Sequence, residues 1–415
     1  MAADRAKYKK LSSPGRRMAT ACGWLLPVLC SMTGLACAQQ ASRATLPAVT
    51  PEYFGLVFSD VDGTKPWPSI TFGSWRMWDA RVTWADLEPK RGEWSFALLD
   101  RMVTDAEAHK TKVLLVLAHS PKWASARPTE RGGYGLGLAA EPNNLQDWVN
   151  YVQTVAKRYK GRIEAYQIWN EPSDKSHFTG TVQNLVDLTC SAFAAIQEAD
   201  PSAKVVSAGS AGGGYHIDYQ EKFLAAGGAK CIDVLAHHFY VPRFGPEAMV
   251  PLIRQVREMM RRQGVDKLPL WNTETGWWLA NTDNTPDAAA VAKGGWRKLD
   301  ADAEAGAVIQ RALLLARSEG VERFYWYSWV NPYGWGLTDG QGNAKPAARD
   351  WNRATREMLG RVVRDCRVDK DSSTCSVVDS AGKVREIGWV NGDALTAREG
   401  AAATQASKGS RPFAQ

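Results

Sequence analysis

The sequence predicts an α/β fold, a (β/α)8 TIM barrel with a small C-terminal β-hairpin extension, and three observations support this. Short apolar runs alternate with longer amphipathic stretches, which is typical of βαβ units and a parallel sheet. Eight such runs fall between residues 51 and 360, a number and length that suit a closed barrel. The first run is followed by no glycine-rich phosphate loop, which argues against a dinucleotide-binding fold.

The barrel elements are predicted in chain order from this alternation. The runs expected to form strands are Tyr53–Phe58, Ser74–Trp78, Val113–Ala118, Ala165–Trp169, Val205–Ala208, Val234–Tyr240, Leu268–Thr273 and Arg323–Trp329. The amphipathic stretches expected to form helices are Leu98–His109, Leu145–Tyr159, Val182–Glu198, Pro246–Gln263, Ala301–Ser318 and Lys345–Leu359. The triplet Gly212–Gly214 lacks the spacing of a phosphate-binding loop, and we interpret it as a flexible loop.

The C-terminal part of the chain shows a different pattern. Residues 361–397 are expected to form a small disulfide-linked β extension, in which Cys375–Val378 and Val384–Trp389 flank a turn at Asp379–Lys383. A piece of this size cannot build a robust core of its own, so we expect it to pack on the barrel. Residues 398–415 are small and polar and are expected to be a disordered tail.

The N-terminus resembles an export signal. A basic stretch ends at Arg16-Arg17, an apolar stretch follows, and Ala36-Cys37-Ala38 has the form of a leader-peptidase site. We therefore expect residues 1–38 to be a signal peptide and 39–50 a linker, which places the mature protein outside the cell or in the periplasm with no stable membrane span. A retained anchor and lipidation at Cys37 are the alternatives.

The charge of the chain is concentrated in this segment. The formal net charge is +7, but residues 1–38 hold six basic residues against one acidic residue, so the remainder carries +2. A nearly neutral mature protein has no electrostatic footprint for nucleic acid.

Cleavage after residue 38 would leave four cysteines, an even number that permits disulfides in an exported chain. Cys366 and Cys375 flank a short polar loop and are the first expected pair, while Cys190 and Cys231 form either a second pair or free thiols. No Cys-x-x-Cys or histidine-rich spacing indicates a metal, and no cofactor is predicted.

Two glutamates carry the functional signal. In Ile168-Trp169-Asn170-Glu171-Pro172 an apolar strand runs into Asn-Glu-Pro, and in Trp271-Asn272-Thr273-Glu274-Thr275-Gly276 a second strand ends in a carboxylate and a glycine turn. Side chains at the carboxyl ends of barrel strands face the mouth, where active sites lie. About three βα units separate the two glutamates, so both are expected to reach one small ligand across the mouth.

Paired carboxylates suit the cleavage of a glycosidic bond. One carboxyl group protonates the leaving oxygen, while the other attacks the anomeric carbon or activates water. Retention of configuration requires a separation of about 5–5.5 Å, and inversion about 6.5–9.5 Å.

These residues resemble clan A of the glycoside hydrolases, with the closest resemblance to family 39 and its relatives in bacterial exopolysaccharide gene clusters, over residues 53–358. Supporting stretches are Arg76–Asp79, Trp84–Pro89, Gly92–Trp94, Ser120–Ala124, Tyr325-Trp326, Gly336–Asp339 and Lys345–Ala347. The resemblance implies that Glu171 is the acid/base and Glu274 the nucleophile of a retaining enzyme.

The resemblance also implies roles for neighbouring residues. Asn170 would contact the sugar 2-hydroxyl, and Arg76 would lie near the nucleophile. His238-Phe239-Tyr240 matches a His-x-Tyr motif whose tyrosine hydrogen-bonds the nucleophile, although the adjacent His237 leaves the register open.

The tryptophans are expected to contribute to the site. Of the 18 in the chain, Trp326 resembles the one that floors the first subsite, and Trp123 and Trp277 follow strands 3 and 7, where they line a sugar cleft or simply pack the loops. Asn331-Pro332 stands where family 39 commonly has an acidic residue, so the xylosidase and iduronidase specificities of that family are not carried over.

The predicted function is that of a retaining glycosidase acting on β-linkages in an extracellular or periplasmic polysaccharide, with an endo-acting cleft for a bacterial exopolysaccharide favoured. The partner is then a polysaccharide or oligosaccharide substrate. A non-catalytic carbohydrate-binding or matrix protein, and an exo-glycosidase such as a β-xylosidase, are the alternatives.

Overall fold

The computed structural model describes residues 46–59, 66–279, 296–299, 302–330, 334–339 and 341–391. All of them belong to one compact unit, Arg43–Gln415. The predicted signal peptide, most of the predicted linker and the predicted tail lie outside the described residues. The end of the expected linker is packed on the barrel, because Val49 is buried and its N–H donates to the carbonyl of Arg361 at 2.8 Å.

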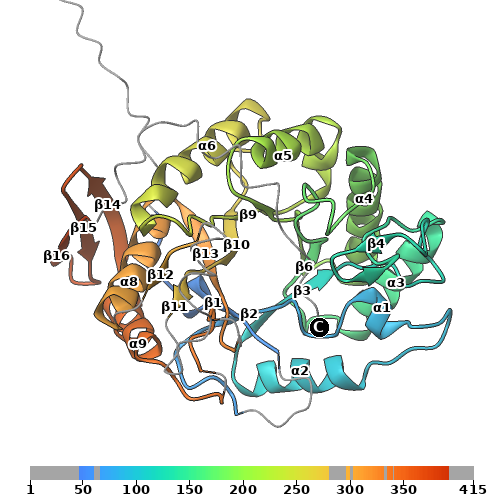
Figure 1. Ribbon diagram of the computed structural model, residues 1–415, viewed down its shortest axis with the longest axis horizontal. Coiled ribbons are helices and arrows are strands. Elements are labelled where there is room, and N and C mark those ends of the chain that lie inside the picture. The colour runs from blue at the N-terminus through green and yellow to red at the C-terminus, as the bar shows by residue number, and fades with distance from the viewer. Residues whose placement is uncertain are drawn as a thin grey trace, which may run out of the picture. The chain divides into compact units, whose positions relative to one another are not determined.

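Eight parallel strands form the predicted barrel, with the helices around it (Figure 1). They are β1 (Phe54–Val57), β2 (Ser74–Met77), β3 (Lys112–Leu117), β6 (Ala165–Ile168), β7 (Lys204–Val206), β9 (Leu235–His238), β10 (Leu270–Thr275) and β13 (Val321–Tyr327). The first and last strands pair, with Phe54 opposite Phe324. The ring closes between β7 and β9 through a bridge of Val206 and Val234, and β8 (Ser210–Ala211) then adds to β9. The predicted fold class is confirmed.

Two of the longer helices begin at side-chain caps. Asn144 accepts the backbone N–H of Gln146 at the start of α3, and Thr181 and Asn184 form a capping box at the start of α4. The helices are α1 (Trp84–Leu87), α2 (Ala97–Ala108), α3 (Leu145–Arg158), α4 (Val182–Ala199), α5 (Tyr215–Ala225), α6 (Met249–Arg262), α8 (Asp302–Ser318) and α9 (Pro346–Met358), with 3-10 turns η1 (Pro51–Tyr53), η2 (Gly228–Cys231) and η3 (Pro246–Ala248). The sequence pattern did not predict α5, which begins directly after the glycine triplet expected to be a loop.

The core lies inside the barrel and between the strands and the helices. Strands β1, β2, β6, β9 and β10 are buried at every position, as expected for parallel strands covered on both faces. Eight tryptophans are fully buried, namely Trp75, Trp84, Trp148, Trp169, Trp271, Trp277, Trp326 and Trp351. In the described part of the chain, no helix combines the length and apolarity needed to cross a membrane.

The C-terminal extension is a three-stranded antiparallel sheet of β14 (Val362–Val368), β15 (Ser372–Val378) and β16 (Val384–Val390). The sequence indicated only the last two strands, because the charged residues Arg364, Asp365 and Arg367 interrupt the apolar pattern of β14. The indole of Trp389 donates to Glu247 at 2.8 Å and so attaches the sheet to the barrel.

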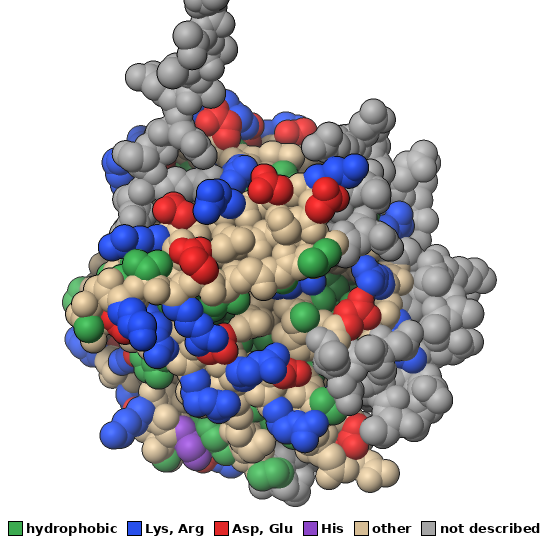
Figure 2. Space-filling model, turned by 90° about the vertical axis from the view of Figure 1, so that its left-hand side faces the viewer, with side chains coloured by type: hydrophobic (Ala, Val, Ile, Leu, Met, Phe, Trp, Pro, Cys, Tyr) green, Lys and Arg blue, Asp and Glu red, His purple; other side chains and the backbone are tan. Residues whose placement is uncertain are grey.

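Two disulfides join neighbouring elements. Cys366 and Cys375 link β14 to β15, and Cys190 and Cys231 link α4 to η2. The side of the molecule that carries the extension in Figure 1 faces the viewer in Figure 2, where basic and acidic side chains are interspersed.

Candidate active site

The two glutamates predicted from the sequence lie together at the carboxyl ends of the barrel strands. Glu171 follows β6, and Glu274 is the penultimate residue of β10. His238 ends β9 between them. One ligand atom from each of these three residues lies within 4.8 Å of the others, so a carboxylate oxygen of Glu171 is within 4.8 Å of one of Glu274. The barrel thus brings both groups to one mouth.

Glu274 is held by two donors. Arg76 Nη1 donates to Oε2 at 2.7 Å, and the Tyr240 hydroxyl donates to Oε1 at 2.9 Å. The Arg76 side chain is completely buried and that of Glu274 is 10% exposed. The contact of Tyr240 with Glu274 is the one that the His-x-Tyr resemblance implied. A carboxylate fixed at both oxygens keeps a single orientation toward the mouth.

Arg76 links this carboxylate to strand β6. Its Nη2 donates to Asn170 Oδ1 at 2.6 Å and its Nε donates to Gln167 Oε1 at 2.8 Å, so three sides of the guanidinium fork are used. The Gln167 amide in turn donates to Thr273 Oγ1 at 3.2 Å. Sequence reasoning missed Gln167, a polar residue in an apolar strand, although such a residue in a buried strand needs partners.

Glu171 is held by its backbone and by histidines. Its φ is +43°, a left-handed value that few residues other than glycine adopt, and its N–H donates to the carbonyl of Gly209 at 2.9 Å. A hydrogen bond of 2.8 Å joins Glu171 Oε1 to Nδ1 of His238, and Nδ1 of His177 lies 3.7 Å from Oε2. The side chain is 17% exposed and opens on the mouth.

His238 stays neutral in this environment. Burial lowers its pKa to about 3, and its Nε2 has no hydrogen-bond partner among the described residues. A Cβ on Gly209 would lie 2.2 Å from Nε2, so only glycine fits there. In a neutral imidazole the role of Nδ1 toward Glu171, donor or acceptor, depends on the tautomer.

The register question at β9 is settled by strand alternation. The ring of His237 points away from the carboxylates, with Nε2 2.8 Å from the Gly212 carbonyl and Nδ1 3.0 Å from Gln220 Oε1. His238 and Tyr240 therefore face the mouth, as the sequence-based assignment had them.

The structure does not bring Trp326 or Trp277 to the mouth. Both are fully buried and stack on each other at 5.8 Å, and Trp326 also contacts Trp351 of α9 at 6.4 Å. Successive residues of a strand point to opposite faces, so Trp326 faces the helices while Tyr327 faces inward. The expectation that Trp326 floors a subsite is thus corrected.

Trp123 also lies away from the carboxylates. Its indole donates to the Glu88 carbonyl at 2.9 Å, its ring packs edge-on against Trp84, and Arg91 covers its face at 4.4 Å. Trp123 belongs to a cluster beside α1.

The aromatic wall of the mouth is built by other residues. The Trp335 ring lies 5.7 Å from Tyr240, 4.7 Å from Trp296 and 6.4 Å from Tyr327. Trp335 lies in the loop after β13. A flat apolar face beside Glu274 suits the stacking of a sugar ring.

A third carboxylate, Asp79, also faces the mouth. It follows β2 with a φ of +53°, and its Oδ2 accepts the Tyr327 hydroxyl at 2.9 Å. The residue is open to solvent, but the protein packed around its carboxyl group, together with the charge of Glu274, raises its pKa to about 6. Asp79 stands inside the Arg76–Asp79 stretch that supported the family resemblance, yet the sequence assigned it no role.

Glu171, His238 and Glu274 have the spacing of metal ligands, but the charges around them do not suit a cation. Arg76 lies 2.7 Å from Glu274 Oε2, where its permanent positive charge opposes a metal ion. The three residues fit proton transfer and nucleophilic attack better than metal binding.

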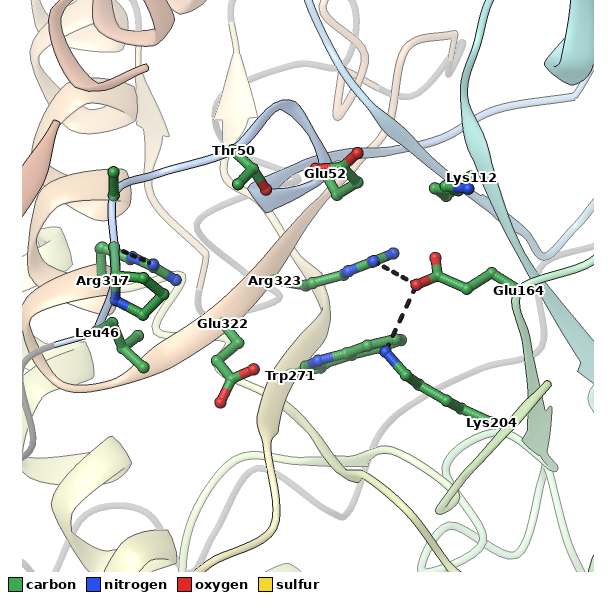
Figure 3. A pocket seen from close by; sticks show the side chains of 12 residues that line it. Leu46, Thr50, Glu52, Lys112, Glu164, Lys204, Trp271, Arg317, Glu322 and Arg323 are labelled. Atoms are coloured by element: carbon green, nitrogen blue, oxygen red, sulfur yellow. Dashed lines mark hydrogen bonds and ion pairs between the residues drawn. The ribbon is translucent and has the colours of Figure 1, made fainter. Parts of the chain in front are cut away.

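A separate cavity of about 300 Å³ lies at the other end of the barrel, where the strands begin (Figure 3). Three of its charged side chains pair with one another. Arg323 donates to Glu164 at 2.7 Å, Lys204 lies 3.6 Å from the same carboxylate, and Arg323 covers Trp271 at 4.5 Å. This end of a barrel serves stability rather than catalysis.

Comparison with known proteins agrees with the geometry. Residues 77–208 match the model of glycosyl hydrolase family 10. The matched segment contains Glu171 and ends before Glu274. The fold and this match confirm the resemblance to clan A of the glycoside hydrolases.

Two curated relatives are xylanases. The chain is 34% identical over 123 residues to endo-1,4-beta-xylanase 2 of Claviceps purpurea, covering 28% of this chain and 35% of that protein. It is 26% identical over 225 residues to endo-1,4-beta-xylanase C of Paenibacillus barcinonensis, covering 48% of this chain and 19% of that protein. The chain therefore spans about a third and a fifth of the relatives' lengths.

Solved structures share the fold at low sequence identity. A family 39 glycoside hydrolase from Bacteroides cellulosilyticus WH2 superposes with a TM-score of 0.64 at 16% identity, covering 83% of this chain and 72% of that one. A monomeric beta-xylosidase from Caulobacter crescentus CB15 gives 0.59 at 19% identity, covering 80% and 75%.

Proposed function

We propose that this protein is a retaining glycoside hydrolase that cleaves β-glycosidic bonds by double displacement, with Glu274 as nucleophile and Glu171 as acid/base. The observation that carries the proposal is the approach of the two carboxylates to within 4.8 Å. This spacing suits the retaining mechanism, because an inverting enzyme needs about 6.5–9.5 Å to admit a water molecule.

The contacts of the two groups support their separate roles. Arg76 and Tyr240 orient Glu274 through both oxygens, which fits a group that attacks an anomeric carbon. Glu171 shares its hydrogen bond with the neutral His238, which fits a group that donates a proton to the leaving oxygen and later takes one from water.

The substrate is proposed from the relatives and from the predicted export signal. The curated relatives are xylanases, so β-1,4-xylan is the first polymer to test, and a bacterial exopolysaccharide outside the cell or in the periplasm is the second. Reducing-end release measured on both polymers, beside binding measured on the same polymers, distinguishes this proposal from a non-catalytic carbohydrate-binding protein.

The roles of the two glutamates are tested by substitution. Glu274→Ala is expected to abolish turnover of an aryl glycoside, and azide is expected to restore it as a glycosyl azide of inverted anomeric configuration. Glu171→Ala is expected to retain the first step on substrates with activated leaving groups. Glu322→Ala, the same change at the opposite end of the barrel, is the matched control and should keep full activity. Full activity of Glu274→Ala would overturn the proposal.

A further inference from the structure

Asp79 occupies the mouth in a way that a packing role does not require. Four of the six non-glycine residues with positive φ in the described part of the chain lie at this mouth, namely Asp79, His119, Trp169 and Glu171. Backbone strain of this kind concentrates at functional sites. Asp79 shares it with Glu171, and the residue as a whole is exposed to solvent, although protein packs around its carboxyl group.

The partners of Asp79 come from two different walls of the mouth. Tyr327, on β13, donates its hydroxyl to Oδ2 at 2.9 Å, and Tyr134 lies close enough to the same carboxyl group to lower its pKa. Tyr134 sits in the turn between β4 (Arg131–Gly132) and β5 (Gly135–Leu136), in the loop after β3. The Tyr327 hydroxyl orients the carboxylate and leaves its remaining lone pairs to a ligand, since an ionised carboxyl group accepts about four hydrogen bonds.

Tyr134 and Tyr327 also contact residues that lie beside the two glutamates. The Tyr134 ring lies 5.5 Å from that of His177, which stands 3.7 Å from Glu171 Oε2. The Tyr327 ring lies 6.4 Å from Trp335, in the aromatic wall beside Glu274. A sugar ring placed against Glu274 and this wall therefore has Asp79 at its edge.

The charges of this corner favour a neutral ligand. The negative charge of Glu274 is close enough to Asp79 to raise the pKa of the Asp79 carboxyl group. The guanidinium of Arg76 already donates to Glu274, Asn170 and Gln167. Arg76 therefore has no donor left to pair with a carboxylate on the ligand. Hydroxyl groups of a ligand, in contrast, can donate to the carboxylates of Asp79 and Glu274.

We propose that Asp79 is a specificity residue, whose carboxylate accepts hydroxyl groups of the sugar bound against Glu274 and repels sugars that carry a carboxylate. The inference rests on the proposed glycosidase function and adds the class of sugar, a neutral glycosyl unit rather than a uronic acid. It applies to the unit that forms the covalent bond to Glu274.

The test uses the full-length protein and compares two substrates that differ only at carbon 6, p-nitrophenyl β-glucoside with a neutral hydroxymethyl group and p-nitrophenyl β-glucuronide with a carboxylate. A second neutral probe is p-nitrophenyl β-xyloside. The wild type is expected to prefer the better neutral probe at least about 100-fold in kcat/KM. Asp79→Asn keeps the shape and removes the charge, and should lower this preference at least about 10-fold. Tyr327→Phe removes one orienting hydroxyl and keeps the charge, so it should keep the preference while raising KM.

The outcomes separate the two proposals. A preference unchanged in Asp79→Asn, with both activities falling in proportion, would show a purely structural role and overturn the inference while the glycosidase function stands. A wild type that prefers the glucuronide would also overturn it. Absence of turnover on every aryl glycoside, without azide rescue of Glu274→Ala, would reject the proposed function and this inference together.

Discussion

The ion pair of Arg76 and Glu274 offers the sharpest energetic test of the site. Arg76→Met removes the guanidinium and keeps most of the side-chain volume, while Glu274→Gln removes the negative charge and keeps the shape. The Arg76 side chain is fully buried and Glu274 is 10% exposed, so neither group is well solvated once its partner is gone. The two changes and their combination form a double-mutant cycle.

The expected magnitude follows from the geometry. With Nη1 and Oε2 at 2.7 Å the two charge centres are about 4 Å apart, which corresponds to about 4 kcal/mol at an effective dielectric constant near 20. Breaking a buried pair by removing one partner typically costs about 3–5 kcal/mol, because the other charge remains uncompensated. We therefore expect Arg76→Met to lower the free energy of unfolding by about 3–5 kcal/mol. The double variant should lose at least about 2 kcal/mol less than the sum of the single variants.

The assay is urea denaturation followed by tryptophan fluorescence, with circular dichroism as a second probe. The matched control is the exposed pair of Lys90 and Glu93, whose side chains are 75% and 63% exposed, changed in the same way to Met and Gln. Exposed pairs are screened by solvent, so this cycle should show almost no coupling. Losses at Arg76 and Glu274 that add to within about 0.5 kcal/mol would refute the reasoning, because independent sites behave in that way.

Three further predictions concern activity, pH and cross-links. Tyr240→Phe should lower kcat about 10- to 100-fold with little loss of stability, since a hydrogen bond to a charged group contributes about 1.5–3 kcal/mol, and steady-state kinetics would show it. Three buried histidines with pKa values lowered by burial to about 3 should make the fold less stable as the pH falls below about 6.5, because the unfolded chain then binds more protons. The residues are His119, His237 and His238, and at one pH unit below that value each should lower the free energy of unfolding by roughly 1.4 kcal/mol. Denaturation measured across pH tests this, and a stability that does not change with pH would contradict it. Replacing Cys190 and Cys231 together by serine should cost about 4 kcal/mol from the 41-residue separation, and an unchanged melting temperature would refute that estimate.

The fold was predictable because the barrel repeats one pattern eight times. Each of the eight apolar runs corresponds to an observed strand, since parallel strands covered on both faces are continuous apolar segments. Helix α5 and strand β14 were not predicted. Tyr215–Ala225 follows three glycines that suggest a loop, and the charges of Val362–Val368 conceal the strand alternation.

The central part of the site was predictable for a related reason. A carboxylate at the carboxyl end of a barrel strand must face the mouth, so strand positions alone brought Glu171 and Glu274 together. Gln167 and Tyr134 were not predictable in this way. Gln167 interrupts an apolar strand, and Tyr134 reaches the site from a loop whose path depends on contacts with Ser176 and Ala139.

The tryptophans show which further information the sequence lacked. The residue type made Trp326 a candidate surface for stacking a sugar. The direction of its side chain depends on which residues of β13 point into the barrel, and the neighbouring strand β1 decides that. Gly55 lies opposite Tyr325, and a Cβ on Gly55 would lie 2.4 Å from the Tyr325 ring. Because only a glycine leaves room for that ring inside the barrel, Tyr325 and Tyr327 point inward and Trp326 points to the helices. The residue that makes Tyr327 of β13 face Asp79 is therefore Gly55 on β1. The sequence of β13 alone would not reveal this.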